Sequence, residues 1–263
     1  VPADGTGFEQ ALASAADAIL MSVADSRVPA IEQRTRARDA FARIAESGKT
    51  PLVMVNYPRT RILRDDVEAV LVPGLAGVFL SHTVQPQDVR DLGALLREFE
   101  LARGIEPGTI TVFPVIDAAR GLLRAAEIVD AAPRVGGLVF AAERYAHDVG
   151  ARHEESGPRL SYARGAVVAA ARAFGLLPLV QASSLQLREM AQYGFGGAVL
   201  SEPGAAAAAN AAFTPPAVDL ERAKSVVDAY DAARAEGAWV VRVGEEVIDA
   251  PEARKARQSL ELQ

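Results

Sequence analysis

The stretch GGLVFAAERYAHDVGARH, residues 136–153, decides the fold. It begins with an uninterrupted apolar run, 137–142, and continues with a charged segment that contains Glu143, Arg144 and Asp148. A short apolar run without polar alternation is typical of a parallel strand that is covered on both faces. Residues that follow such a strand lie at its carboxyl end, where α/β proteins carry their binding groups. The stretch therefore predicts one strand–helix unit with functional side chains at the strand end.

Further apolar runs of the same kind lie on both sides of this stretch. They cover residues 18–23, 51–56, 76–80, 110–116, 176–182 and 197–201. The segments between them have helical spacing, and several end at glycine or proline, as the one before Gly48 does. With an eighth strand at residues 1–2, clipped by the start of the sequence, the pattern predicts an α/β fold of the (β/α)8 TIM barrel type. An open doubly wound sheet is the alternative, but no run is followed by the G-x-G-x-x-G pattern of dinucleotide-binding sheets.

The pattern changes near residue 214. Residues 214–263 predict a helix that ends at Gly237, a hairpin that turns at Gly244, and a last helix. We therefore divide the chain into a barrel, 1–213, and a C-terminal helix–hairpin–helix arm, 214–263. The arm is expected to pack on the barrel or on a neighbouring subunit.

Composition excludes several classes of function. The 263 residues include no cysteine, which rules out disulfides, thiolate metal sites and cysteine nucleophiles. The net charge of −6 argues against a nucleic-acid partner. No apolar run approaches the roughly 20 residues of a membrane span, and no signal peptide is visible. We expect a cytoplasmic protein with neither a membrane nor a nucleic-acid partner.

Motifs in the right order carry a resemblance to a known family. They include FPVIDAARG (113–121), VFAAERYAHDVG (139–150), YARGAVVAAARAFGL (162–176) and GFGGAVLSEP (194–203). The chain resembles the citrate lyase beta-subunit-like proteins of the HpcH/HpaI aldolase superfamily, nearly from end to end. The resemblance implies a (β/α)8 barrel, a trimer, and an arm that reaches a neighbour's active site. It also implies magnesium and the cleavage or formation of carbon–carbon bonds in acyl-CoA or 2-oxo-acid substrates.

The resemblance also implies a metal site that is altered here. Asp117 matches the family's first metal ligand, and Arg144 stands where the family has its second. A guanidinium group has no lone pair for magnesium and would repel it, so Glu143, beside it, is the remaining candidate ligand. We expect Arg144 and Asp117 to form an ion pair, about 3–4 Å long. In that pair, Arg144 either binds an anionic ligand or only neutralises Asp117 after the loss of the metal.

Other candidate site residues follow the predicted strands. The candidate substrate-binding residues are Arg144, Asn56, Arg59 and His82. Of these, Asn56 matches an asparagine of the family, and His82 matches a lysine of the family. Met54 replaces a family arginine, and Arg59 or Arg61 either takes over its role from the loop or is a solvated loop charge. Asp25 and Asp249 are the candidate catalytic acids. Asp249 is either a proton donor or acceptor, or the N-cap of the last helix, and Asp25 is either functional or a turn acid.

Two functions remain open on the sequence alone. The first is a divergent carbon–carbon lyase or aldolase that acts on an acyl-CoA or a small oxo or hydroxy acid, with altered metal and substrate sites. The second is a catalytically inactive family member that binds an anionic metabolite or partners an active paralogue. Magnesium is the cofactor in the first case, unless its site has been lost. The partner is a small anionic metabolite or CoA thioester in either case.

Overall fold

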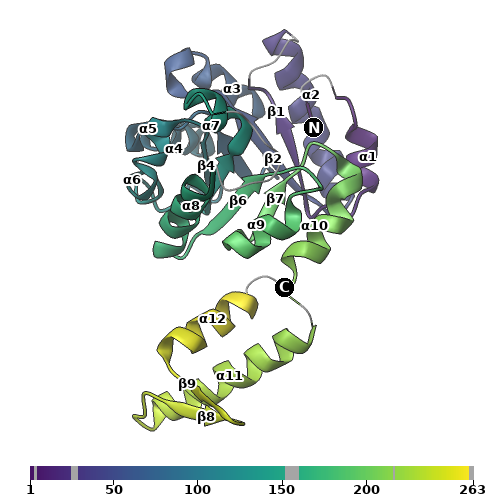
Figure 1. The fold of residues 1–263 in the computed structure, drawn as a ribbon. Helices are drawn as coiled ribbons and strands as arrows, with labels where there is room; N and C mark the ends of the chain where they lie inside the picture. The colour runs from purple at the N-terminus through teal and green to yellow at the C-terminus, as the bar shows by residue number, and fades with distance from the viewer. Residues whose placement is uncertain (3–4, 25–28, 152–159, 216, 261–263) are drawn as a thin grey trace. The chain divides into compact units, whose positions relative to one another are not determined.

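A computed structural model of the chain describes residues 1–2, 5–24, 29–151, 160–215 and 217–260. The chain divides into two compact units, Val1–Asn210 and Ala211–Gln263. The first unit contains a seven-stranded parallel sheet whose strands follow one another in sequence order (Figure 1). These strands are β1 (Ala18–Ser22), β2 (Thr50–Val55), β3 (Gly77–Leu80), β4 (Thr111–Ile116), β5 (Gly137–Ala141), β6 (Leu177–Gln181) and β7 (Gly197–Val199).

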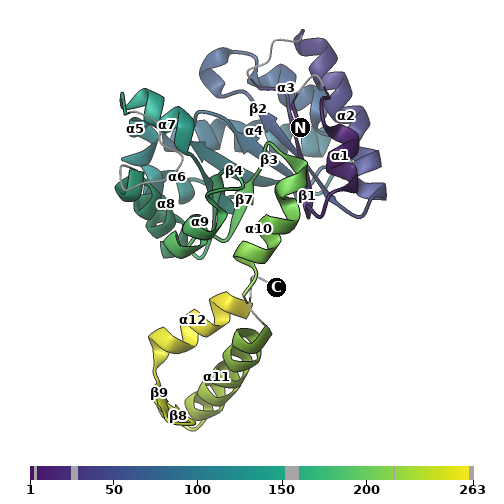
Figure 2. The same ribbon diagram turned by 45° about the vertical axis from the view of Figure 1, so that its right-hand side comes forward.

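Helices separate the strands along the chain. They are α1 (Phe8–Ala13), α2 (Ala30–Glu46), α3 (Leu63–Val70), α4 (Pro86–Ala102), α5 (Ala119–Leu122), α6 (Ala125–Val129), α7 (Ala142–Asp148), α8 (Ser161–Ala173), α9 (Leu187–Tyr193) and α10 (Ala206–Phe213), with 3-10 turns at Pro58–Thr60 and Pro203–Ala205. Contacts between neighbouring helices form a series around the sheet: α2 contacts α3, α3 contacts α4, α4 contacts α6, α6 contacts α8, and α8 contacts α9. Figure 2 shows α1 and α2 at the right of the first unit and α6 and α8 at its left.

The sheet is curled around one apolar cluster. Its buried members are Phe79, Val115, Val139 and Ala141, and side chains of the other strands pack against them: Leu20, Leu52, Met54, Phe113, Leu179 and Val199. All seven strands thus contribute to a single cluster, including β1 and β7 at opposite ends of the sheet. A flat sheet of this width does not bring its two end strands to one cluster, so the sheet is bent into a half-barrel. Alternate residues, such as Ile19 and Met21, point to the helices instead.

The fold prediction is confirmed in its coarser form. Each predicted apolar run coincides with a strand to within a few residues, and the chain has an α/β fold with a curled parallel sheet. The doubly wound alternative is wrong, because its strand order reverses at a switch point, whereas the order here is sequential. No strand is assigned at residues 1–2 in the described part of the chain, although Val1 lies beside β1. The Ser22 amide donates to the Val1 carbonyl (3.2 Å), and the Val1 amino group donates to the Leu20 carbonyl (2.6 Å).

The second unit has its own small core. It comprises α11 (Ala217–Ala235), the antiparallel strands β8 (Val241–Val243) and β9 (Glu246–Ile248), and α12 (Ala250–Leu260). Val226, Tyr230, Ile248 and Ala253 are among the buried residues that join both helices to the hairpin. The elements predicted after residue 214 are therefore present, and their role as an arm stays a prediction. Across the residues that the structure describes, no helix combines the length and apolarity needed to cross a membrane.

Candidate functional site

Three predicted site residues meet at the carboxyl ends of neighbouring strands. His82 follows β3, Asp117 follows β4 directly, and Arg144 lies on α7, which begins where β5 ends. Because β3, β4 and β5 are adjacent in the parallel sheet, the chain segments that leave them emerge side by side. This edge of the sheet is where α/β barrels carry their ligands.

Asp117 is the centre of this group. Its side chain is only 3% exposed. Oδ1 lies 2.8 Å from Nδ1 of His82, and Oδ2 lies 4.0 Å from Nη1 of Arg144. Burial raises the pKa of Asp117 above its ordinary value, and the neighbouring His82 and Arg144 offset this only in part. A buried carboxylate is costly unless it is paired, so these two side chains are its main stabilising partners.

His82 is held in a defined orientation by its backbone. Its φ of 46° lies in the left-handed region, which side chains other than glycine rarely adopt. The next residue fixes this turn: the Thr83 hydroxyl donates to the Leu80 carbonyl (2.9 Å) and the Thr83 amide donates to the Val115 carbonyl (3.0 Å). A carboxylate can only accept, so Nδ1 carries the hydrogen and Nε2 is left as the ring's second nitrogen. Strained backbone of this kind is concentrated at functional sites.

The Tyr57 ring adds an aromatic wall that was not assigned a role from sequence. Its centroid lies 4.8 Å from that of His82, with the ring planes inclined by 58°. Tyr57 comes shortly after the end of β2, two residues before the candidate substrate-binding residue Arg59. The one sequence signal that could have identified Tyr57 is its position, as an aromatic residue just after a strand end.

The two charged residues after β5 diverge. The backbone turns into α7 at Ala142, so Glu143 and Arg144 lie in the first turn of a helix and not on a strand. Arg144 reaches Asp117 with half of its side chain exposed (50%). Glu143 is exposed, and the described part of the chain offers it no hydrogen bond or ion pair. Asp148 accepts the Ala119 amide (2.7 Å) and so ties α7 to the start of α5.

Asn56 and Arg59 are engaged in networks of their own. The backbone amide and Nδ2 of Asn56 donate to Oδ2 of Asp66 (3.0 and 2.8 Å), and Nδ2 also donates to the Val23 carbonyl (3.2 Å). Arg59 donates to both oxygens of the buried Asp88 (2.8 and 3.4 Å) and lies over the Tyr57 ring. Asn56 thus anchors the end of β2, and Arg59 neutralises Asp88 next to the wall of the site. Their substrate-binding roles stay predictions.

The two predicted catalytic acids do not belong to the described part of the first unit. Asp25 lies outside the described residues. Asp249 belongs to the second unit, where Oδ1 accepts the Glu252 amide (3.1 Å) and the carbonyl accepts the Ala253 amide (3.0 Å). This is the geometry of an N-cap, with the side chain bonded to the third residue of α12.

The N-cap geometry predicts the effect of changing Asp249. Asp249→Ala is expected to lower the stability of the second unit by about 1 kcal/mol, because the Glu252 amide loses its acceptor. Asp249→Asn retains an accepting oxygen and should keep the stability of the wild type. Thermal unfolding of both variants measures this. Loss of activity in Asp249→Asn without loss of stability would instead assign Asp249 a chemical role.

The described residues around Asp117 do not fit a magnesium ion. Magnesium requires nearly octahedral oxygen ligands at about 2.0–2.1 Å. Oδ1 of Asp117 is already bonded to Nδ1 of His82, and Oδ2 faces the Arg144 guanidinium. Arg144 would repel a cation at short range. Among the described residues, no group of three or more aspartate, glutamate, histidine or cysteine side chains is arranged to hold a metal. Asp25 is not among these described residues.

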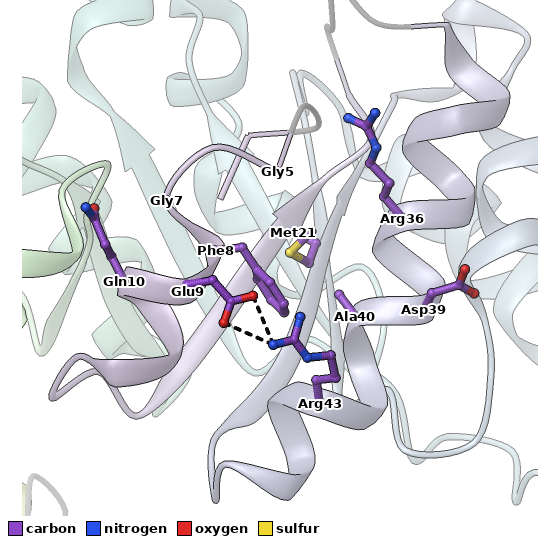
Figure 3. A pocket seen from close by; sticks show the side chains of 10 residues that line it. All are labelled: Gly5, Gly7, Phe8, Glu9, Gln10, Met21, Arg36, Asp39, Ala40 and Arg43. Atoms are coloured by element: carbon purple, nitrogen blue, oxygen red, sulfur yellow. Dashed lines mark hydrogen bonds and ion pairs between the residues drawn. The ribbon is translucent and has the colours of Figure 1, made fainter.

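A separate cavity of about 610 Å³ lies on the helical side of β1 (Figure 3). Met21 of β1, Phe8 of α1 and Ala40 of α2 supply its apolar lining. Its opposite charges are already paired, since Arg43 donates to both oxygens of Glu9 (2.9 and 3.0 Å). No predicted site residue lines it, so the strand-end group remains the candidate site.

Comparison with known proteins identifies the family and agrees with the fold. The sequence model of the family described as HpcH/HpaI aldolase/citrate lyase matches residues 3–203. The citrate lyase beta subunit of Escherichia coli strain K12 is 31% identical over an alignment of 202 positions, which covers 73% of this chain and 67% of that protein. The (3S)-malyl-CoA thioesterase of Cereibacter sphaeroides strain ATCC 17023 is 26% identical over an alignment of 269 positions, which covers 96% of this chain and 88% of that protein.

A solved structure has the same fold. Protein CitE from Mycobacterium tuberculosis, in complex with magnesium, acetoacetate and coenzyme A, matches with a TM-score of 0.70 and 24% identity. The match covers 100% of this chain and 95% of that one. At this identity the likeness establishes the fold.

Proposed function

Because this chain belongs to the HpcH/HpaI aldolase/citrate lyase family, we propose that it acts on a small oxo or hydroxy acid or its CoA thioester. The reaction class is that of a divergent carbon–carbon lyase or aldolase. The observation that carries the proposal is the buried Asp117, bonded to His82 and faced by Arg144 at the carboxyl ends of β3, β4 and β5. We also propose that the half-barrel closes through an eighth strand, with Val1 in its place beside β1.

The three side chains suit the proton transfers of this reaction class. Cleavage of a 3-hydroxy thioester removes the hydroxyl proton, moves the bonding pair to the carbon beside the thioester, and returns a proton to that carbon. Asp117 orients His82 through Nδ1, so that Nε2 is the atom that accepts and returns the proton. Arg144 holds the substrate carboxylate through its guanidinium donors. These three side chains can carry the proton transfers without magnesium, which the described donor set around Asp117 does not fit.

An inactive family member is the second candidate function. Two replacements favour it: Arg144 has taken the place of an acid, and Met54 lies in the apolar cluster inside the sheet, where it offers no charge to a substrate. Such a protein would bind an anionic metabolite or partner an active paralogue. The trimer and the cytoplasmic location remain part of the proposal; the trimer is carried over from the resemblance, and the location from the composition of the sequence.

A product assay separates these functions. Purified protein is incubated with (3S)-malyl-CoA, and aldehyde or ketone products are trapped with phenylhydrazine while free thiol is measured in parallel. Lyase activity is expected to release the carbonyl product. Asp117→Ala should reduce this to background, while the exposed Arg120→Gln on α5 should not change it. Free thiol without carbonyl product would indicate thioester hydrolysis, and neither product from a panel of hydroxyacyl-CoA thioesters would leave the inactive form.

A further inference from the structure

The charge arrangement at Asp117 has a consequence for what the site can bind. A site built around a divalent cation needs several oxygen atoms that converge on one point. Here Asp117 is the only buried carboxylate in the His82–Asp117–Arg144 group, and its two oxygens face one nitrogen each. The positive charge near Asp117 therefore belongs to the protein itself.

Arg144 is placed to serve a ligand as well as Asp117. Its Nη1 is 4.0 Å from Asp117 Oδ2, at the outer limit of an ion pair, so the pairing is not a tight bidentate one. Half of its side chain is exposed, and α7 fixes its backbone next to the end of β5. A planar guanidinium presents several N–H donors in a fork that matches the two oxygens of a carboxylate.

His82 and Tyr57 complete a small surface beside this guanidinium. The His82 ring is fixed by Asp117 and by the left-handed turn, and the Tyr57 ring lies against it. Together they offer one hydrogen-bonding nitrogen and an aromatic face. A short carboxylate with a second oxygen on a neighbouring carbon fits this combination of groups, since it is flat, anionic and able to accept or donate a hydrogen bond.

We infer that this site binds a small 3-oxo or 3-hydroxy carboxylate without a divalent cation, with Arg144 supplying the positive charge that a metal would otherwise supply. The inference rests on the proposed function for the location of the site. The proposed function concerns turnover, whereas this inference concerns the binding of the carboxylate and its dependence on a metal.

Calorimetric titration with acetoacetate tests the inference without any assay of activity. The titration is run on chelator-treated protein and again with millimolar magnesium. The dissociation constant is expected to be the same in both conditions, and Arg144→Gln is expected to raise it about tenfold or more in both. Arg120→Gln, an exposed arginine on the neighbouring α5, is the matched control and should leave it unchanged. Binding that requires magnesium, absence of binding, or an unaffected Arg144→Gln variant would each overturn the inference.

A second variant tests the role of Arg144 in excluding the metal. Arg144→Asp places a second carboxylate beside Asp117, and it is expected to bind manganese that the wild type does not bind, as measured by electron paramagnetic resonance. Circular dichroism and thermal unfolding check that the variant is folded. Manganese binding by the wild type at Asp117 would contradict the inference. Turnover that depends on magnesium would retain the proposed function and reject this inference. Metal-free binding of acetoacetate without turnover of any substrate would retain this inference and reject the proposed function.

Discussion

Replacing Glu100 by glutamine is expected to lower the free energy of unfolding by about 3–5 kcal/mol at neutral pH. Glu100, on α4, is completely buried and pairs with Arg134, whose side chain is only 12% exposed. Both Arg134 terminal nitrogens donate to it (3.0 Å each), and so do the amides of Gly108 (3.0 Å) and Ile110 (3.4 Å). Glutamine turns one accepting oxygen into a donor that faces these donors, and it leaves Arg134 without its counter-charge.

The same residue predicts a dependence of stability on pH. Burial alone would raise the pKa of Glu100, but the bonds from Arg134, Gly108 and Ile110 outweigh this and hold it below the ordinary value of 4.5. A carboxyl whose pKa is lower in the folded state contributes stability above its unfolded pKa and loses it as pH falls through the folded pKa. The difference between wild type and Glu100→Gln is therefore expected to shrink as pH falls below about 4.5.

Glu98 provides the matched control on the same helix. It also pairs with an arginine, Arg64, but both side chains are about half exposed, where ion pairs are screened by water and salt. Denaturant unfolding of Glu98→Gln should give nearly the wild-type midpoint, whereas Glu100→Gln should shift it strongly. Equal effects of the two substitutions would show that burial does not decide the contribution of Glu100.

Much of the fold could be predicted because burial leaves a regular trace in the sequence. Strands β3 and β5 are buried at every position, and a strand covered on both faces must be apolar throughout. The runs 76–80 and 137–141 were recognisable for this reason, and the sequential strand order followed from the alternation with helices. An eighth strand, and with it the closure of the barrel, stays a prediction, because residues 1–2 are too few to show any periodicity.

The site could be predicted only in part. Asp117 and Arg144 were expected to meet, and they do, because residues at the ends of adjacent parallel strands must lie close together. The role of Glu143 as a metal ligand stays a prediction: the backbone turns into α7 at Ala142 and leaves the Glu143 side chain exposed. The bond between His82 and Asp117 was not predicted, since it depends on a left-handed turn at a residue that gives no sign of it in sequence. The order of the strands could be predicted from the sequence, but the local backbone conformation could not, and this limited the prediction of the site.

Replacing Gly121 by alanine is expected to destabilise the first unit by about 3 kcal/mol and to disturb His82, because close-packed backbone has no room for the added methyl group. Gly121 lies on α5, where a Cβ atom would come within 2.4 Å of the Thr83 carbonyl oxygen. That oxygen belongs to backbone and cannot rotate away. Thr83 is also the residue that holds the turn at His82, so the strain is expected to reach the His82–Asp117 bond.

Two measurements separate the local effect from general destabilisation. Gly93→Ala on α4 is the matched control, because a Cβ there meets nothing within 4 Å, and alanine in a helix is favoured by about 0.5–1 kcal/mol. Denaturant unfolding should therefore show opposite signs for the two glycine substitutions. The proton shifts of the His82 ring, which the Tyr57 ring influences at 4.8 Å, should move in Gly121→Ala and stay in place in Gly93→Ala. A Gly121→Ala protein with wild-type stability and unchanged His82 shifts would show that α5 does not position the histidine.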